Sequence, residues 1–215
     1  MPNHHGIGCV ILGAGFSRRF GADKRTQSLG SLTVAQTTLQ TYCTVFSEVR
    51  LVLREEDDAQ HIAGEQLRHE NLHLVRTPLA HLGMGHSLSA GFNDLPWRWS
   101  FVALLDMPYV RPATLQALID HAMDSSSKLV QPRLVSATTA TQERSHGHPI
   151  GIHCSLFEHI RASTGDQGAR QLIKQYRDEI AYLDCDDPGV IQDIDQPSDL
   201  MKPSCCLLYT SPSPR

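Results

Sequence analysis

The sequence lacks the features that mark membrane, secreted and nucleic-acid-binding proteins. The longest apolar run, Phe101–Leu105, is far shorter than the roughly 18 residues that a membrane-spanning helix needs. No charged segment followed by a long apolar stretch suggests a secretion signal, so we expect a cytoplasmic location. The formal net charge of -4 gives no reason to expect a nucleic acid or an anionic membrane as a partner, and we predict neither.

Motifs for thiol-based metal sites and for serine hydrolases are also missing. The chain has 6 cysteines, but no two have the C-x-x-C spacing of zinc or thioredoxin sites. We expect reduced and mostly buried thiols. Because the G-x-S-x-G signature is absent, the sequence does not support a serine hydrolase.

Short apolar runs alternate with amphipathic segments along the chain. The 215 residues are 40% hydrophobic and 20% charged, which is typical of a soluble globular protein. Strands are predicted at 7–12, 48–53, 72–75, 100–105, 128–134, 150–153, 179–183 and 190–194. Helices are predicted at 33–46, from 57 to about 69, 85–95, 112–123 and 167–176. This order predicts an α/β, Rossmann-like three-layer αβα fold with a mostly parallel sheet.

We predict a single domain over residues 7–201. The segment at about 136–180 is less regular, and we interpret it as a substrate-binding lobe on the same core. Residues 202–215, with the sequence KPSCCLLYTSPSPR, follow neither a helical nor a strand period. We interpret them as a non-native or disordered tail and leave them out of the fold prediction.

A glycine-rich, cationic loop follows the first predicted strand. It runs from Leu12 to Arg25 with the sequence LGAGFSRRFGADKR. Ligands of open α/β sheets bind beyond the carboxyl ends of strands, which is where this loop lies. Glycine allows the backbone to approach a ligand closely and to adopt positive φ, so that N–H groups can cradle phosphate oxygens. Four side chains add positive charge: Arg18, Arg19, Lys24 and Arg25. A polyphosphate is the ligand we expect for this loop.

The loop differs from two better-known phosphate motifs. Arg18 stands where the dinucleotide fingerprint needs a glycine. A P-loop has four residues between its glycines followed by Lys-Ser/Thr, whereas five residues separate Gly15 from Gly21 and Ala22 follows. Neither NAD binding nor P-loop ATP hydrolysis is supported. A solvated glycine turn with surface arginines stays an alternative.

Two aspartates follow predicted strands that are far apart in the sequence. Asp106 ends the run ALLD, and Asp195 lies in DIDQP. Strand alternation points Asp193 and Asp195 to one face and Ile194 to the other. Mg²⁺ prefers one or two carboxylates with phosphate oxygens and water, which makes Asp106 and Asp195 candidate Mg²⁺ ligands. The alternatives are a helix cap at Asp106 and a turn-forming aspartate at Asp195.

Two later segments offer polar groups to a substrate. His148 stands between Gly147 and Pro149, which present its imidazole from a fixed backbone. A hydrogen-bonded structural histidine is the alternative. The segment 165–170, GDQGAR, opens a predicted helix whose N–H groups are suited to an anion, while an ordinary N-cap at Asp166 is the alternative.

Together these motifs resemble the MobA-like nucleotidyltransferase family. The loop is similar to the family signature L-A-[AG]-G-x-S-x-R-[MF]-G-x-x-K, with Gly13 in place of the usual alanine. Further segments similar to family motifs follow in order: 83–91, 106–108, 147–149, 165–170 and 193–197. The later motifs, and Ala14 where guanylyltransferase relatives carry glycine, are most similar to molybdenum cofactor cytidylyltransferases.

The resemblance implies a nucleotide-diphospho-sugar-transferase-like fold and Mg²⁺-dependent transfer of CMP from CTP, or from another NTP, to the terminal phosphate of a molybdopterin-type cofactor. Its implied nucleotide-binding residues are Leu12, Gly13, Ala14, Gly15, Ser17, Arg18, Lys24, Ser87 and Asp106. Among them, Arg18, Lys24 and Asp106 would be catalytic. Asp106 and Asp195 would hold the metal, and His148, Gly165 and Asp166 would contact the pterin.

Three alternative functions stay open. A GTP-dependent guanylyltransferase for the same cofactor and a sugar-phosphate nucleotidyltransferase share the loop. A non-catalytic nucleotide-binding chaperone would deliver the cofactor without turnover. The protein partner implied by the resemblance is a molybdoenzyme or its chaperone.

Overall fold

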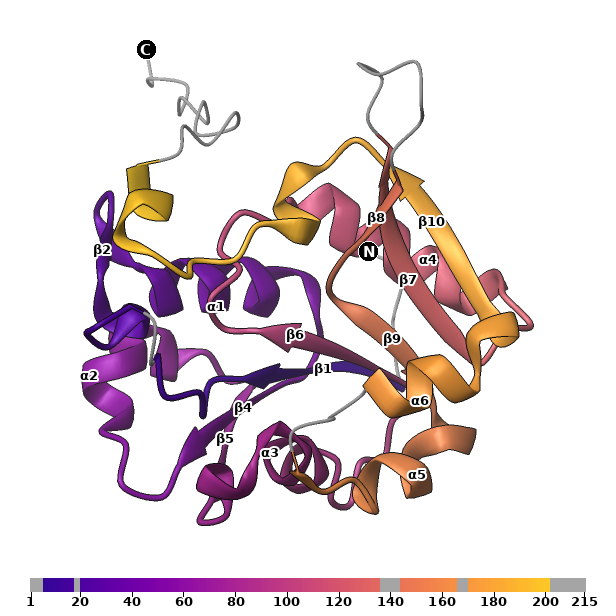
Figure 1. Ribbon diagram of the computed structural model, residues 1–215, viewed down its shortest axis with the longest axis horizontal. Helices are drawn as coiled ribbons and strands as arrows, with labels where there is room; N and C mark the ends of the chain where they lie inside the picture. Colours follow the sequence, from indigo (N-terminus) through magenta and orange to yellow (C-terminus); the bar gives the residue numbers. More distant parts are fainter. Residues whose placement is uncertain (1–5, 18–19, 136–143, 166–169, 202–215) are drawn as a thin grey trace.

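A mixed eight-stranded sheet forms the central layer of the molecule, and helices pack on both of its faces (Figure 1). The computed structural model describes residues 6–17, 20–135, 144–165 and 170–201. In spatial order the strands are β10 (Ile180–Cys185), β7 (Leu129–Val135), β9 (Ile150–His153), β6 (Trp99–Leu104), β1 (Ile7–Leu12), β4 (Val49–Arg54) and β5 (Leu72–Thr77), and β8 (Arg144–His146) pairs with β7. The predicted α/β class with a mostly parallel sheet is confirmed.

One half of the sheet, β6-β1-β4-β5, is entirely parallel. Strands β1, β4 and β6 are rich in Val, Ile and Leu and almost fully buried, as expected for strands covered by helices on both faces. Leu12 of β1 pairs with Leu104 of β6 and with Val52 of β4. Because these strands end at the same level, the loops that follow β1 and β6 begin side by side.

The other half of the sheet reverses direction. Strand β9 runs antiparallel to both β6 and β7, whereas β10 is parallel to β7. The reversal brings the segment before β9, which contains His148, back toward the carboxyl end of β6. Residues from the second half of the chain thereby reach the edge where the first half places its loops.

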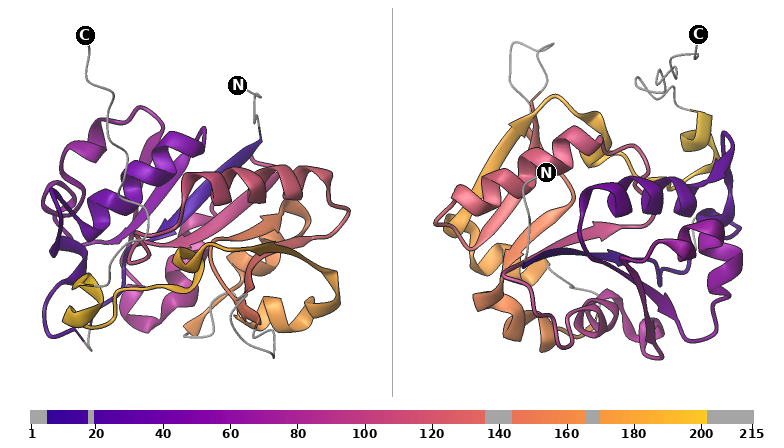
Figure 2. Two further views of the ribbon diagram at one scale, coloured as in Figure 1. Left: turned by 90° about the horizontal axis from the view of Figure 1, so that it is seen from above. Right: turned by 180° about the vertical axis from the view of Figure 1, so that it is seen from behind.

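Helices cover both faces of the sheet (Figures 1 and 2). On one face, α1 (Val34–Val45), α2 (Ala59–Ala63) and α4 (Pro112–Asp124) pack over a core that includes Leu39 and Leu115. On the other, α3 (Met84–Gly91), α5 (Phe157–Arg161) and α6 (Arg170–Gln175) pack over a core that includes Leu88 and Ile152. The remaining elements are short: η1 (Lys24–Thr26), β2 (Ser28–Leu29), β3 (Leu32–Thr33), η2 (Gly64–Arg68), η3 (Ala80–Leu82), η4 (Cys154–Leu156), η6 (Arg177–Glu179), η7 (Pro188–Ile191) and η8 (Pro197–Met201).

Some sequence predictions need correction. The helix predicted from Asp57 to about His69 is α2 followed by the 3₁₀ helix η2, because Gly64 has a φ of 55° and interrupts the α-helix. The strand predicted at 190–194 is wrong, since the 3₁₀ helix η7 occupies 188–191 and residues 192–195 pair with no strand in the described sheet. Strand β8 lies in the less regular segment predicted from about 136, where no strand was expected at 144–146, and α5 was not predicted.

Other predictions fall on residues outside the described ranges, among them the start of the less regular segment (136–143) and the tail (202–215). The described cysteines are free thiols; Cys9 and Cys43 are buried, Cys185 is half-buried and Cys154 is exposed. Among the described helices, none has both the length and the apolar composition needed to cross a membrane.

Candidate active site

A cleft lies at the carboxyl ends of the parallel strands. Its first part, which we call the loop cavity, has a volume of about 300 Å³ and is lined by the loop after β1, by α3 and by Asp106. Its second part, the lobe cavity, has a volume of about 330 Å³ and extends to His148 and α6. Both cavities are lined by Leu12, Met84 and Leu104, so they adjoin. The cleft therefore offers two neighbouring compartments at the site expected for a ligand of an open α/β sheet.

The glycine loop is shaped by close packing at its start and by left-handed backbone further along. A β-carbon on Gly13 would lie 2.7 Å from Leu105 Cδ2 and 3.0 Å from Leu53 Cδ2, which explains glycine where the family signature has alanine. Positive φ occurs at Ser17 (47°) and Gly21 (79°), so of the loop glycines only Gly21 needs its conformational freedom. The strained backbone at Ser17 lies at the cavity wall, where functional sites commonly tolerate strain.

Arg25 is buried beneath the loop. Its Nη1 donates to the carbonyl oxygen of Gly13 at 2.7 Å, and its two terminal nitrogens donate to Asp57 at 2.7 and 2.8 Å. Burial opposes the charge on Arg25, but hydrogen bonds to Asp57 and Asp23 outweigh it and raise its pKa. The prediction that Arg25 offers positive charge to a polyphosphate is therefore wrong. Its charge is neutralised internally, and it fixes the loop to the end of β4.

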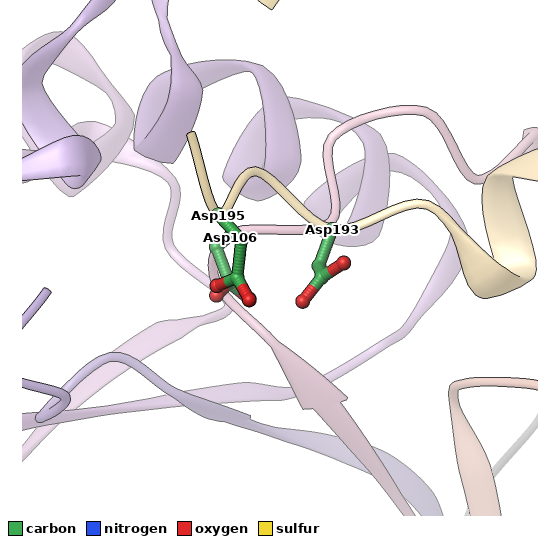
Figure 3. Close-up of side chains that lie close together, drawn as sticks. All are labelled: Asp106, Asp193 and Asp195. Carbon is green, nitrogen blue, oxygen red and sulfur yellow. The ribbon is translucent and has the colours of Figure 1, made fainter. Parts of the chain in front are cut away.

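Three carboxylates from two distant segments converge beside the loop cavity (Figure 3). Asp106 follows β6, whereas Asp193 and Asp195 lie in residues 187–195, which we call the return segment. Carboxylate oxygens of the three lie within 4.8 Å of one another. Ile194 is fully buried and donates its N–H to the carbonyl oxygen of Asp106 at 2.9 Å. The predicted alternation of these side chains is thus confirmed although no strand forms.

Lys24 binds the same carboxylates. Its Nζ lies 2.5 Å from Asp106 Oδ2 and 3.0 Å from Asp195 Oδ1. Burial opposes the ammonium charge, but Asp106 and Asp195 outweigh it and raise the pKa of Lys24. Burial, together with the carboxylates of Asp195 and Asp106, raises the pKa of Asp193. Clustered carboxylates of this kind favour a bound cation, because it offsets their mutual repulsion.

The lobe cavity is mostly apolar, with polar groups from three separate elements. These are Gln131 of β7, His148 and Arg170 of α6. Gln131 is buried and its Nε2 donates to the carbonyl oxygen of Gly147 at 3.2 Å. His148 Nδ1 is buried and has no hydrogen-bond partner among the described residues. Burial lowers the pKa of His148 below its usual value, which keeps the imidazole neutral at pH 7.

A scan of protein-family models finds that residues 9–180 match the MobA-like NTP transferase domain. The chain belongs to this family. Its activity class is therefore nucleotidyl transfer, and the matched range contains the glycine loop, Asp106 and His148. It ends before Asp193 and Asp195, so the family match does not extend to the return segment.

The relatives of this MobA-like NTP transferase include two curated proteins. It is 28% identical to the purine catabolism protein PucB of Bacillus subtilis over 202 residues, which is 88% of this chain and 92% of PucB. It is 21% identical to a probable molybdenum cofactor guanylyltransferase of Natranaerobius thermophilus over 128 residues, covering 59% of this chain and 60% of that protein. Neither relative establishes the cytidylyltransferase subtype.

Solved structures share the fold. The crystal structure of Rv0371c from Mycobacterium tuberculosis H37Rv has a TM-score of 0.74 and 25% identity, and the match covers 93% of this chain and 97% of that one. A second crystal structure of Rv0371c, in complex with manganese, has a TM-score of 0.70 and 24% identity, with 91% of this chain and 96% of that one covered.

The cleft of this MobA-like NTP transferase brings together most residues singled out from the sequence. The loop cavity is lined by Leu12, Ala14, Gly15, Ser17, Ser87 and Asp106. Gly13 and Lys24 line a small adjoining cavity. Gly165 has a φ of 65°, and its carbonyl oxygen would lie 2.9 Å from a β-carbon on Gly85, so it packs against the start of α3. Arg18 and Asp166 lie outside the described residues.

One alternative raised from the sequence is wrong, and two residues of the cleft and its carboxylate cluster were not singled out as site residues. Asp106 does not cap α4, because the N-cap position of that helix is Arg111. Asp193 joins the carboxylate cluster as a third member. Gln131 lines the lobe cavity from the buried first half of β7; a polar side chain directly after the apolar Leu129 and Val130 was the available signal.

Proposed function

We propose that the chain transfers CMP from CTP to the terminal phosphate of a molybdopterin-type cofactor and releases pyrophosphate. The observation that carries this proposal is the meeting of two cavities beside a cluster of three carboxylates and one lysine. A donor in the loop cavity and an acceptor in the lobe cavity would have their phosphates at the shared wall. Transfer between two phosphates requires that proximity.

A divalent cation, with Mg²⁺ as the first choice, fits the carboxylate cluster. Oxygen ligands from Asp106, Asp193 and Asp195 are the donor set that hard cations prefer. The manganese complex of Rv0371c supports a divalent cation in a protein of this fold. When bound, the cation would supply positive charge to the α-phosphate and to the leaving pyrophosphate. Asp106 and Asp195 are the ligands we propose first, and Asp193 would complete the set.

The chain's own residues would bind and orient the donor. Backbone N–H groups of the glycine loop would contact the triphosphate, with Arg18 and Lys24 neutralising its charge. Ala14 and Ser87 would contact the cytosine. An oxygen of the acceptor's phosphate would then form a bond to the α-phosphorus as the bond to the β-phosphate oxygen breaks. Positioning and charge neutralisation supply the catalysis, so no covalent enzyme intermediate is needed.

The lobe cavity favours a flat heterocyclic acceptor over a sugar phosphate. Its walls are mostly aliphatic, including Leu88, Val102 and Ile150, and its polar groups are concentrated at Gln131, His148 and Arg170. A sugar would bury hydroxyl groups against aliphatic side chains, at a cost for each unpaired group. A pterin presents apolar faces to those walls and polar edge atoms to Gln131 and His148. Gly165 and Asp166 are retained as proposed contacts of the acceptor.

A guanylyltransferase is the second candidate, favoured by the relative from Natranaerobius thermophilus. Against it stands Ala14, which is buried in the loop cavity and reduces the space for a purine.

The relative PucB is a purine catabolism protein. Its similarity to this chain supports purine catabolism as the process that the proposed nucleotidyl transfer serves.

The test is a turnover assay with every combination of donor and acceptor. CTP, GTP and ATP are each incubated with Mg²⁺ and with molybdopterin cofactor or glucose 1-phosphate, and pyrophosphate release is measured. We expect release with CTP and the molybdopterin cofactor, and none with the sugar phosphate. A preference for GTP would establish the guanylyltransferase instead. Tight CTP binding without pyrophosphate release for any acceptor would favour the non-catalytic chaperone.

A further inference from the structure

Asp187, at the start of the return segment, is a buried carboxylate with three hydrogen bonds. Only 1% of it is exposed. Its Oδ2 accepts from the backbone N–H of Arg111 at 2.8 Å and from Thr114 Oγ1 at 2.7 Å, and its Oδ1 accepts from the N–H of Gly189 at 2.9 Å. These hydrogen bonds offset the free-energy cost of burying the carboxylate, which would be high without them.

Asp187 supplies the start of helix α4 with a hydrogen-bond acceptor from a distant part of the chain. The N-cap residue of α4, Arg111, makes no side-chain capping bond within the described part of the chain. The carboxylate of Asp187 binds the N–H of Arg111 and the hydroxyl of Thr114 instead, and the positive end of the helix dipole stabilises its charge. The return segment is thereby fixed to the start of α4.

The same segment is then held against the loop that carries Asp106. A β-carbon on Gly189 would lie 2.1 Å from the carbonyl oxygen of Tyr109, so the two backbones are in direct contact there. Five residues further on, Ile194 donates its N–H to the carbonyl oxygen of Asp106 at 2.9 Å. Three contacts in a row therefore fix how far Asp193 and Asp195 stand from Asp106: those at Asp187, Gly189 and Ile194.

The acceptor side of the cleft is attached to the same segment. His148 donates its backbone N–H to the carbonyl oxygen of Val190 at 2.7 Å. A β-carbon on Gly147 would lie 2.3 Å from that same oxygen. The segment anchored by Asp187 thus positions the metal-site carboxylates on one side and the imidazole of the lobe cavity on the other.

We propose that Asp187 is a positioning residue that sets the spacing of Asp106, Asp193 and Asp195 for a divalent cation. This inference rests on the metal site of the proposed function and adds a residue that lies outside the carboxylate cluster. Asp187 does not touch the substrates or the cation in this account. It acts through the return segment, whose irregular backbone pairs with no strand in the part of the chain that the structure describes.

The experiment measures Mn²⁺ binding directly, without nucleotide, by titration calorimetry and by the electron paramagnetic resonance signal of free Mn²⁺. The variant is Asp187→Asn, which keeps the size and removes the charge. The matched control is Asp186→Asn, because Asp186 is the exposed neighbour and also pairs with Arg111. We expect Asp187→Asn to weaken Mn²⁺ binding by roughly tenfold or more, the scale seen when outer-shell partners are lost. The control should stay within about twofold, since its ion pair is exposed.

A purely structural role for Asp187 predicts a different pattern. It would lower the melting temperature of Asp187→Asn while the folded protein kept the Mn²⁺ affinity of Asp186→Asn, and that result would overturn the proposal. If Asp187→Asn does not fold, Thr114→Val removes one of the three hydrogen bonds and Thr114→Ser retains it. Weaker Mn²⁺ binding in the valine variant than in the serine variant supports the positioning role. Equal binding in the two overturns it.

Asp106→Asn separates failure of this inference from failure of the metal site itself. If the wild-type protein does not bind Mn²⁺, or if Asp106→Asn binds it as well as wild type, the proposed metal site is wrong and the positioning role with it. If binding depends on Asp106 but is unchanged in Asp187→Asn, the metal site stands and only the role of Asp187 is refuted.

Discussion

The two cavities of the cleft are built in different ways. The loop cavity is assembled at the end of a parallel sheet. The continuous loop after β1 and the end of β6 supply Ser17 and Asp106, and the neighbouring η3 and α3 add His81 and Ser87. The lobe cavity takes its polar groups from a buried strand, a returning loop and a helix, where the sheet has turned antiparallel. A site like the loop cavity suits chemistry that a whole family shares, because a short sequence motif specifies it. A site like the lobe cavity suits selection of the acceptor, since single residues on separate elements can change independently.

Asp106 lines the loop cavity, two residues after Leu104 of the wall that the two cavities share, and its loss should have the largest effect. Asp106→Asn keeps the shape but removes a charge that pairs with Lys24 and that we assign to the metal. We expect the rate of pyrophosphate release at saturating substrates to fall at least about a hundredfold, the scale of a lost electrostatic contact to a transition state. Asp120→Asn, on the exposed side of α4, is the control for one lost charge. Activity within tenfold of wild type would remove Asp106 from the mechanism.

The contrast between the cavities also explains what could be predicted from the sequence. The end of β1, the glycine loop and Asp106 were predicted because a buried apolar run followed by glycine or aspartate is a local signal. In the second half, β9 was predicted with the correct ends. Residues 190–194 of the return segment were assigned to a short strand, whereas the structure has η7 and an irregular stretch there.

What the sequence could not supply were contacts between residues far apart in the chain. The N–H of Arg111 and the carboxylate of Asp187 are separated by 76 residues, and their hydrogen bond directs the return segment away from the sheet. In the same way, Arg25 had the appearance of a phosphate ligand because its partner Asp57 lies 32 residues away. Local pattern gives the charge of a side chain but not the distant group that neutralises it.

The second-largest effect should be a loss of stability when the buried ion pair beneath the glycine loop is broken. Burial raises the pKa of Asp57, but hydrogen bonds from Arg25 and Arg54 outweigh it and lower the pKa from 3.8 to about 2. At about 1.4 kcal/mol per pKa unit, Asp57→Asn should lower the free energy of unfolding near neutral pH by about 2 kcal/mol. Glu56→Gln is the control, since that side chain is 69% exposed and its ion pair with Arg54 should contribute little.

The pH dependence follows from the direction of that shift. Because the pKa of Asp57 is lower in the folded state, its stabilisation is fully present above its unfolded value near 3.8 and is lost as the pH falls toward about 2. Urea unfolding from pH 7 to pH 2 should therefore show a constant gap between wild type and Asp57→Asn that closes below about pH 4. A gap that persists unchanged at pH 2 would mean that the ion pair with Arg25 is not its source.

In the lobe cavity, Gln131→Leu should change recognition of the acceptor but not of CTP, although it also removes the hydrogen bond to the carbonyl oxygen of Gly147. Leucine fills similar space and removes the amide that we assign to the polar edge of the acceptor. We expect KM for the acceptor to rise about tenfold, which corresponds to one lost hydrogen bond in a buried site, with KM for CTP unchanged. Gln60→Leu, an exposed position on α2, is the control. A rise in both KM values together would indicate a distorted cleft and would contradict the separation of the two cavities.

The smallest effect should be on the choice of base in the loop cavity. Ala14 is buried there, so Ala14→Gly removes one methyl group and makes room for a larger base. We expect the ratio of kcat/KM for CTP to kcat/KM for GTP to fall by about tenfold, the lower end of what one apolar carbon contributes to discrimination. Ala22→Gly adds the same backbone freedom at an exposed position of the loop that does not line this cavity, and should leave the ratio unchanged. If both variants shift the ratio equally, loop flexibility selects the base; if only Ala14→Gly does, the shape of the cavity wall selects it.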